Sequence, residues 1–279
     1  MGKHNLNISE RTQNFIQNFY DIATVKWTPS RTIPEISKHL AEKDFTMYEK
    51  DKYYYGLPFT INNKGNLQTF LEQVNNTVYT VPEHIVNIIG ADCVSPIICA
   101  LEEFIKIPIT YLSCDMLWDK TKTECIGKIS FTERKIGTGL IRNRFTEQDF
   151  YESYAQCKIG DLLVTYFPKD FGNMIGHTRI LTGTVHCVRN NNNQINPIAS
   201  YFIVSENKHS LVDTNDNSNY GGLLNNEDYA VSYKGNKDIT DITKWNDLKG
   251  KQTTFRFNRK IPFKLFYDNC YIPLKIKGL

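Results

Sequence analysis

The sequence predicts an α+β fold with a helical layer at its N-terminus and a mostly antiparallel sheet in its second half. Apolar residues recur at helical spacing from Phe15 to Ala23, and runs rich in β-branched residues begin after Asp161. The 279 residues contain no internal repeat and no linker rich in Pro, Gly or Ser. We therefore expect 1–279 to form a single domain, with 1–50 as the helical layer and 51–279 as the core.

Three helices are expected in the first part of the chain. Ser9 is a suitable N-cap for the first of them. A second, short helix is expected after Thr32, with Pro34 in its first turn, where a missing N–H costs no hydrogen bond. A third is expected over 66–75, because the turn residues of 61–65 precede it and its apolar residues follow helical spacing.

The second half alternates between β-branched runs and turn residues. We expect strands over 162–167, 178–188, 198–204, 229–233 and 253–257. Four consecutive Asn residues, 190–193, are expected at the tip of a hairpin that joins the second and third runs. The polar stretch 207–228 is expected to be a mobile surface loop, because it is long for a connection without structure.

Composition excludes several classes of function. Lys and Arg number 33 against 30 Asp and Glu, so the formal charge of +3 is too small to favour a nucleic-acid partner. No apolar run reaches the roughly 18 residues of a membrane helix, and the first residues lack the apolar core of a secretory signal. Seven Cys and six His form no C-x-x-C or H-E-x-x-H motif, so we expect neither a disulfide scaffold nor a metal site.

Cys93 lies where a loop becomes an apolar helix, and we take it as the candidate nucleophile. Pro96 supports a helix start here, because proline is tolerated only in the first turn. The unpaired amides at such a start favour a thiolate, which a sulfur nucleophile requires. A role as the N-cap of this helix explains the presence of Asp92 before Cys93 well. Cys99 lies six residues further along the apolar stretch and is expected to be an inert core thiol.

His177 is the candidate base, since it begins a predicted strand after a glycine. An antiparallel hairpin with its tip at 190–193 returns Glu206 and Asn207 beside it. Only one of these two can face the imidazole, because strand side chains alternate. We choose Glu206 as the third catalytic residue because it shares parity with Phe202 and Val204, and Asn207 stays open. His186 is expected to be structural, and His209 is the second choice for the base.

The order of these motifs resembles the NlpC/P60 group of papain-like cysteine peptidases and amidases. The motifs are Asp92-Cys93, Gly160-Asp161-Leu162-Leu163 and Gly176-His177-Thr178-Arg179-Ile180, together with the upstream stretch Tyr55-Gly56-Leu57-Pro58-Phe59-Thr60. The resemblance extends over roughly 53–273. It implies a papain-like fold, no cofactor, and cleavage of amide bonds in peptidoglycan stem peptides by a Cys–His pair with a polar third residue. It also implies a secreted or cell-envelope protein; a cytoplasmic location stays open, and we expect a monomer.

Five residues are candidates for substrate binding: Tyr54, Tyr55, Phe59, Asp92 and Asn207. For the aromatic ones, the edge of the core and a stacking rim for sugar or peptide are equally good interpretations.

The sequence departs from the family pattern at two places. Val94-Ser95-Pro96 replaces Ser-Gly after the cysteine, and Phe59 replaces a tyrosine, whose hydroxyl one of the residues Tyr53 to Tyr55 could supply. A catalytically silent cell-wall-binding module on the same scaffold is therefore one alternative function. An acyltransferase or transglutaminase-like enzyme is another, because the same thioester can be captured by an amine.

Overall fold

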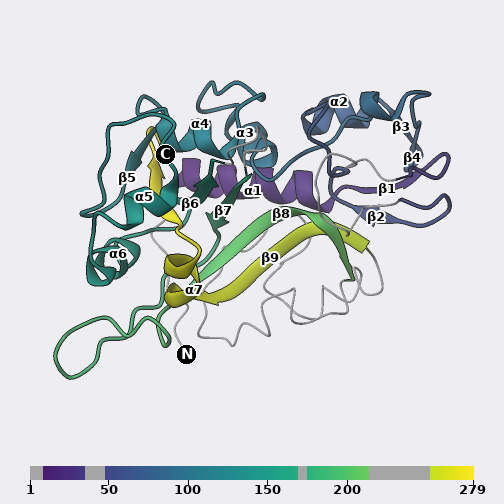
Figure 1. Cartoon of the computed structure of the whole chain (residues 1–279). Helices are drawn as coiled ribbons and strands as arrows, with labels where there is room; N and C mark the ends of the chain where they lie inside the picture. Colours follow the sequence, from purple (N-terminus) through teal and green to yellow (C-terminus); the bar gives the residue numbers. More distant parts are fainter. Residues whose placement is uncertain (1–8, 35–47, 169–174, 214–251) are drawn as a thin grey trace.

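The computed structural model describes residues 9–34, 48–168, 175–213 and 252–279 (Figure 1). Within these residues, helices and one large mixed sheet form an α+β arrangement. The helices are α1 (Glu10–Thr24), α2 (Leu67–Leu71), α3 (Ser95–Leu101), α4 (Ser113–Trp118), α5 (Thr138–Arg142), α6 (Glu147–Tyr154) and α7 (Phe263–Asp268), with a 3-10 turn, η1 (Ile85–Asn87).

The sheet of the described residues has ten strands in the order β3-β4-β1-β2-β9-β8-β7-β6-β10-β5. Their bounds are β1 (Lys26–Pro29), β2 (Tyr54–Tyr55), β3 (Val74–Asn75), β4 (Val78–Tyr79), β5 (Thr123–Cys125), β6 (Leu162–Phe167), β7 (Ile175–Leu181), β8 (Tyr201–Asp213), β9 (Gln252–Pro262) and β10 (Ile272–Ile276). The part of the sheet that runs β9-β8-β7-β6-β10-β5 is antiparallel, as expected. Two pairs, β1–β4 and β2–β9, are parallel, so the sheet as a whole is mixed.

The first helix forms where the sequence predicts it. Ser9 Oγ accepts a hydrogen bond from the Thr12 amide and so satisfies one of the donors left unpaired at the start of α1. The buried stripe of α1, including Phe15 and Phe19, packs against α3. Figure 1 shows α1 as a long helix that crosses behind the middle strands. This position brings the N-terminal layer against the helix that follows Cys93.

The N-terminal layer is not purely helical, which corrects the prediction for 1–50. β1 follows α1 directly and pairs with both β2 and β4. Of the short helix expected after Thr32, with Pro34 in its first turn, the residues from 35 to 47 lie outside the described part, and Ile33 forms a β-bridge with Tyr48.

The helix expected over 66–75 ends early. α2 stops at Leu71, and β3 then pairs with β4. Asn76 and Thr77 between them adopt positive φ angles of 47° and 70°, a backbone that reverses the chain and cannot continue a helix.

The strands of the second half agree with the predicted runs most closely at β6, whose bounds coincide with 162–167. β7 begins and ends earlier than 178–188, because 175–180 pair with all six residues of β6. β9 continues past Phe257 to Pro262 alongside β8. The run 229–233 lies outside the described residues.

The loop predicted over 207–228 is wrong in its first part, because β8 continues to Asp213. Asn207 is buried there, and Leu211 packs against the core. Residues 214–228 lie outside the described residues. The hairpin tip is where the sequence places it: Asn193 N–H donates to the Asn190 carbonyl, and Arg189 and Ile195 form a bridge below the turn.

Most buried apolar side chains of the described residues form one cluster that extends from α1 to β10, and Tyr201 and Ile203 form a separate small pair. Trp27 lies at the centre of an aromatic group and contacts Tyr48, Tyr54, Phe70 and Tyr79. Among the helices that the structure describes, none has both the length and the apolar character needed to cross a bilayer.

Candidate active site

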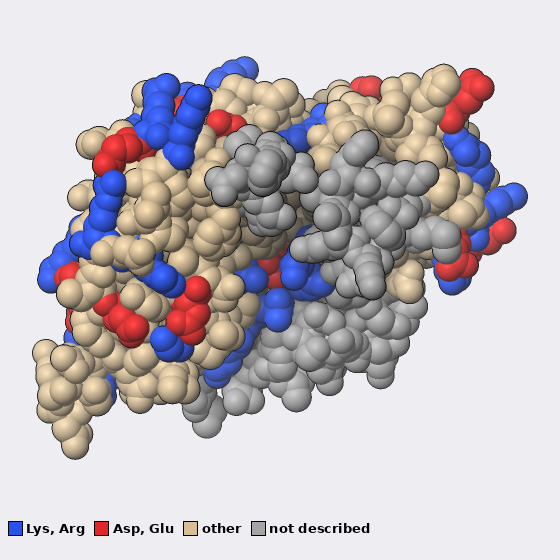
Figure 2. Space-filling view, in the orientation of Figure 1, with Lys and Arg blue, Asp and Glu red and all other residues tan. Residues whose placement is uncertain are grey.

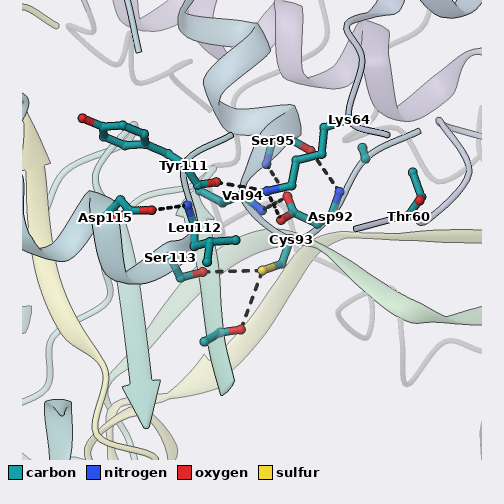
Figure 3. A network of polar contacts seen from close by, with 12 residues as sticks. Thr60, Lys64, Asp92, Cys93, Val94, Ser95, Tyr111, Leu112, Ser113 and Asp115 are labelled. Carbon is teal, nitrogen blue, oxygen red and sulfur yellow. Dashed lines mark hydrogen bonds and ion pairs between the residues drawn. The ribbon is translucent and has the colours of Figure 1, made fainter. Parts of the chain in front are cut away.

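The loop before α3 is held by its own polar groups (Figure 3). Asp92 Oδ1 accepts hydrogen bonds from the amides of Val94, at 3.0 Å, and Ser95, at 2.7 Å. In return, Ser95 Oγ accepts from the Asp92 amide at 2.9 Å. Pro96 occupies the first turn of α3, as expected. Asp92 therefore caps this helix start. Its carboxylate accepts hydrogen bonds from two amides that could otherwise stabilise a negative charge on the Cys93 sulfur.

A buried ion pair fixes the same loop from the other side. Lys64 Nζ lies 2.7 Å from Asp92 Oδ2, and the two side chains are only 9% and 6% exposed. Lys64 Nζ also donates to the Tyr111 carbonyl at 3.1 Å. Burying such a pair costs desolvation free energy. Removing one partner is strongly destabilising, because the other charge is then left buried and unpaired. It ties the residue before Cys93 to the loop that leads into α2.

The Cys93 thiol lies at the edge of β7. Its Sγ is 3.5 Å from Ser113 Oγ and donates to the Gly176 carbonyl at 3.7 Å. The Thr178 amide is a further hydrogen-bond partner of the sulfur. The sulfur therefore contacts the main chain on both sides of His177. β8 pairs with β7 only at Ile180 and Leu181, so the Cys93 loop occupies the edge of β7 that β8 leaves uncovered.

Burial and, after it, the neighbouring Asp92 carboxylate raise the pKa of the Cys93 thiol to about 12. The hydrogen bonds from Ser113 and Thr178 and the charge of Lys64 oppose this shift but do not overcome it. The expectation of a thiolate stabilised by the helix start is therefore wrong for this arrangement. The reason is that Asp92, and not the sulfur, receives the helix-start amides.

His177 and Glu206 are brought together by the register of β7 and β8. His177 Nε2 lies 2.5 Å from Glu206 Oε2. The same oxygen accepts from Arg179 Nε at 2.7 Å, and Oε1 accepts from Arg259 Nη1 at 2.9 Å. Glu206 is fully buried, and Arg179 and His177 hold the pKa of its carboxyl well below the usual value against the effect of burial. Burial lowers the pKa of His177 below 6.5, and the Glu206 carboxylate opposes this.

Asn207 faces the opposite side of β8 and has a different contact. Its Nδ2 donates to the carbonyls of Ala91, at 3.2 Å, and Asp92, at 3.0 Å. Of the two residues left open by the sequence, Glu206 thus contacts the imidazole, and Asn207 holds the loop before Cys93. The alternation of strand side chains is the physical reason for this division.

Cys93 and His177 themselves share no hydrogen bond or ion pair in the described part of the chain. Thr178 points toward Ser113, to which its hydroxyl donates at 2.8 Å, while His177 points to the other face, toward Glu206. The Cys93 sulfur contacts the residues before and after His177 on the strand, but its side-chain partner is Ser113.

The aromatic candidates for substrate binding divide between the core and its edge. Tyr54 is 1% exposed, contacts Trp27 and Tyr48, and its hydroxyl accepts from the Glu49 amide. It belongs to the core and presents no surface to a substrate, which corrects its assignment. Tyr55 is half-buried in β2. The Phe59 amide donates to the Tyr48 hydroxyl, and its main chain bridges to Ala91, close to the Cys93 loop.

The alternative histidines give no second site. The His186 ring stacks on Tyr201 with 4.5 Å between centroids, in agreement with a structural role. The side chain of His209 lies outside the described part. All seven cysteines are free thiols, and no group of three metal-ligating side chains occurs among the described residues. Cys99 donates weakly to the Gly65 carbonyl.

Sequence reasoning missed Lys64, Ser113, Arg179 and Arg259 at this site. Arg179 had a usable signal, since it is two residues after His177 on the same strand and must share its face. Lys64 lies in a loop and Ser113 begins α4, and the approach of both to Cys93 depends only on the tertiary fold.

No model of a known protein family, no curated protein and no solved structure matches this chain.

Proposed function

We propose that the protein is a cysteine hydrolase that cleaves an amide bond in a peptidoglycan stem peptide or a related peptide. In this proposal Cys93 is the nucleophile, His177 is the base, and Glu206 orients the imidazole. The main support is one juxtaposition: the Cys93 sulfur contacts the main chain on both sides of His177, whose Nε2 is bound to a buried carboxylate. The motif order that resembles NlpC/P60 peptidases adds the substrate class.

The Glu206 contact determines which imidazole nitrogen is available. A carboxylate accepts hydrogen bonds, so it favours the tautomer with the proton on Nε2 and leaves Nδ1 as the basic nitrogen. Burial lowers the pKa of His177, which favours the neutral ring that can accept a proton. The starting state in this proposal is a neutral thiol beside a neutral imidazole, not an ion pair.

Catalysis then begins with rotation of the Cys93 side chain away from Ser113 toward His177. Nδ1 takes the thiol proton while Sγ forms a bond to the carbonyl carbon of the substrate, and the carbonyl oxygen becomes an oxyanion. The Cys93 amide has no acceptor within the described residues and is a donor for that oxyanion. The C–N bond breaks as the amine receives the proton from the imidazolium. Water then hydrolyses the thioester with His177 again as base.

The test is turnover of a muropeptide mixture, with products identified by mass spectrometry. We expect cleavage by the wild-type chain and by Cys99→Ala, and none by Cys93→Ala with its fold intact. Cys99 is the matched control, since it is also a partly buried thiol, in α3, and its pKa is raised to about 12, mainly by burial. Cleavage that survives Cys93→Ala would refute the nucleophile.

A silent binding module is the second candidate, and the state of the thiol favours it. With a pKa of about 12 and contacts to Ser113 and Gly176, Cys93 resembles an inert buried thiol. If wild-type protein binds muropeptides in calorimetry without cleaving them over a long incubation, the binding module is correct and the hydrolase is not.

A further inference from the structure

Tyr271 lies in one row with His177 across three neighbouring strands. Thr165 on β6 pairs with His177 on β7, and Val164, the residue before Thr165, pairs with Ile272 at the start of β10. Antiparallel pairing therefore places Tyr271 opposite Thr165. Residues directly across from each other share a face of the sheet, so the Tyr271 side chain belongs to the face that carries the candidate catalytic imidazole.

The Tyr271 ring is held by its neighbours on this face. The Arg179 guanidinium carbon lies 4.9 Å from the centroid of the ring, at cation–π distance, and Arg179 Nε donates to Glu206. The Phe266 ring meets the Tyr271 ring edge-on, with 5.2 Å between centroids. The Tyr271 amide donates to the Phe266 carbonyl at 2.9 Å, and the Tyr271 carbonyl accepts from the Tyr154 hydroxyl at 2.7 Å. The position of the side chain therefore does not depend on its hydroxyl.

The Tyr271 hydroxyl has no hydrogen-bond partner among the residues that the structure describes, although the side chain is only 5% exposed. Polar groups that are buried to this extent normally have a partner. The hydroxyls of six other buried tyrosines each take part in a hydrogen bond: Tyr20, Tyr48, Tyr54, Tyr79, Tyr151 and Tyr154. The hydroxyl of Tyr271 is therefore a donor that the fold positions without using it.

This hydroxyl lies within electrostatic reach of the groups of the candidate site. Burial raises the pKa of Tyr271 well above its ordinary value. The charge of Arg179 opposes this shift, whereas the Glu206 carboxylate and, when it is ionised, the Cys93 thiol add to it. The hydroxyl thus keeps its proton, and it stays a hydrogen-bond donor, at every pH at which an imidazole can act as the base.

Glu206 does not need this donor. Its two oxygens already accept hydrogen bonds from His177, Arg179 and Arg259. In Figure 2, red atoms lie among blue ones near the middle of the face, over the part where Figure 1 shows β8 and β9, in agreement with an acidic group enclosed by basic side chains. The Tyr271 hydroxyl is therefore left for an acceptor that a bound molecule supplies.

We propose that Tyr271 is a further catalytic residue, whose hydroxyl donates a hydrogen bond to the carbonyl oxygen of the scissile amide. The inference rests on the proposed function, because attack by Cys93 is what brings that carbonyl to the site. Rotation of Cys93 away from Ser113 carries the sulfur, and the carbonyl carbon that it attacks, toward the face on which His177 and Tyr271 lie. The Cys93 amide and the Tyr271 hydroxyl are then two donors for the oxyanion. The hydroxyl keeps its own proton, so the proton transfers assigned to His177 are unchanged.

The experiment measures kcat and KM of Tyr271→Phe on a muropeptide that the wild-type chain cleaves. Tyr166→Phe is the matched control. Tyr166 is 3% exposed, and its hydroxyl likewise has no partner in the described part of the chain, but it follows Thr165 and so points to the opposite face of the sheet. We expect Tyr271→Phe to lower kcat roughly 100-fold and to change KM less than about twofold, because it removes a donor that acts mainly on the transition state. Tyr166→Phe should turn over like the wild type.

Two further measurements separate this role from an effect on the fold or on His177. Both substitutions keep the ring, so both urea midpoints should equal that of the wild type. A lowered midpoint for Tyr271→Phe would show that the hydroxyl has a partner in the free protein and would overturn the proposal. The acidic limb of the pH–rate profile should stay in place, and a shifted limb would overturn the proposal as well, because Tyr271 would then act through Glu206.

The turnover results distinguish this inference from the proposed function. Equal kcat values for Tyr271→Phe and Tyr166→Phe, with cleavage by the wild type, overturn the role of Tyr271 and leave the hydrolase intact. Absence of cleavage by the wild type refutes the hydrolase and this role with it.

Discussion

Asp92→Asn tests the buried ion pair that holds the Cys93 loop. The substitution keeps an oxygen that can accept from the two helix-start amides, but it removes the charge opposite Lys64. Removing one partner of a buried pair costs roughly 3–5 kcal/mol. Because Lys64 keeps its hydrogen bond to the Tyr111 carbonyl, we expect the lower end, about 3 kcal/mol.

Urea unfolding followed by tryptophan fluorescence measures this loss. With a slope of about 3 kcal/mol per M, the midpoint should fall by about 1 M. The double variant Lys64→Met/Asp92→Asn should be more stable than Asp92→Asn alone, since it leaves no unpaired ammonium in the interior. A midpoint for Asp92→Asn within about 0.2 M of the wild type would show that the pair does not hold the loop.

The same variant has a second readout at the thiol. The Asp92 carboxylate raises the pKa of Cys93 and the Lys64 charge lowers it, so neutralising Asp92 should move the pKa down. Alkylation of Cys93 by iodoacetamide should then begin at lower pH than in the wild type. Peptide mapping resolves the individual thiols, and the exposed Cys187 serves as the internal reference. An unchanged or higher onset would refute the electrostatic argument.

Three further substitutions separate the roles of neighbouring groups. Glu206→Gln should reduce turnover and move the acidic limb of the pH–rate profile to lower pH, because the carboxylate raises the pKa of His177; movement to higher pH would contradict the assignment. Asn207→Ala should leave that profile in place and cost about 1–3 kcal/mol in urea unfolding, since two carbonyls lose their donor; a shifted profile would make Asn207 the orienting residue. Cys99→Ala should retain turnover and lose on the order of 1 kcal/mol of stability. A loss of turnover at unchanged stability would make Cys99, and not Cys93, the nucleophile.

Local patterns in the sequence are sufficient for the elements whose formation depends on near neighbours. Ser9 and the apolar spacing after it predict α1, and Pro96 predicts the helix start beside Cys93. The bounds of β6 and the turn at 190–193 also follow from short stretches. The contact between His177 and Glu206 could be predicted because hairpin register and side-chain parity are properties of two adjacent strands.

The properties of the site depend on groups far apart in the sequence, and only the tertiary structure decides them. The thiol pKa of Cys93 is raised because the fold buries the sulfur and because Asp92 takes the helix-start amides while paired to Lys64. Tyr54 becomes a core residue because β2 lies against Trp27. A bulge in β9 turns Arg256 and Arg259 to the side of the sheet on which Glu206 lies, and no local pattern of charges in the sequence predicts this. Sequence periodicity reports which face a side chain prefers, whereas burial, charge and pKa depend on what the rest of the chain brings to that face.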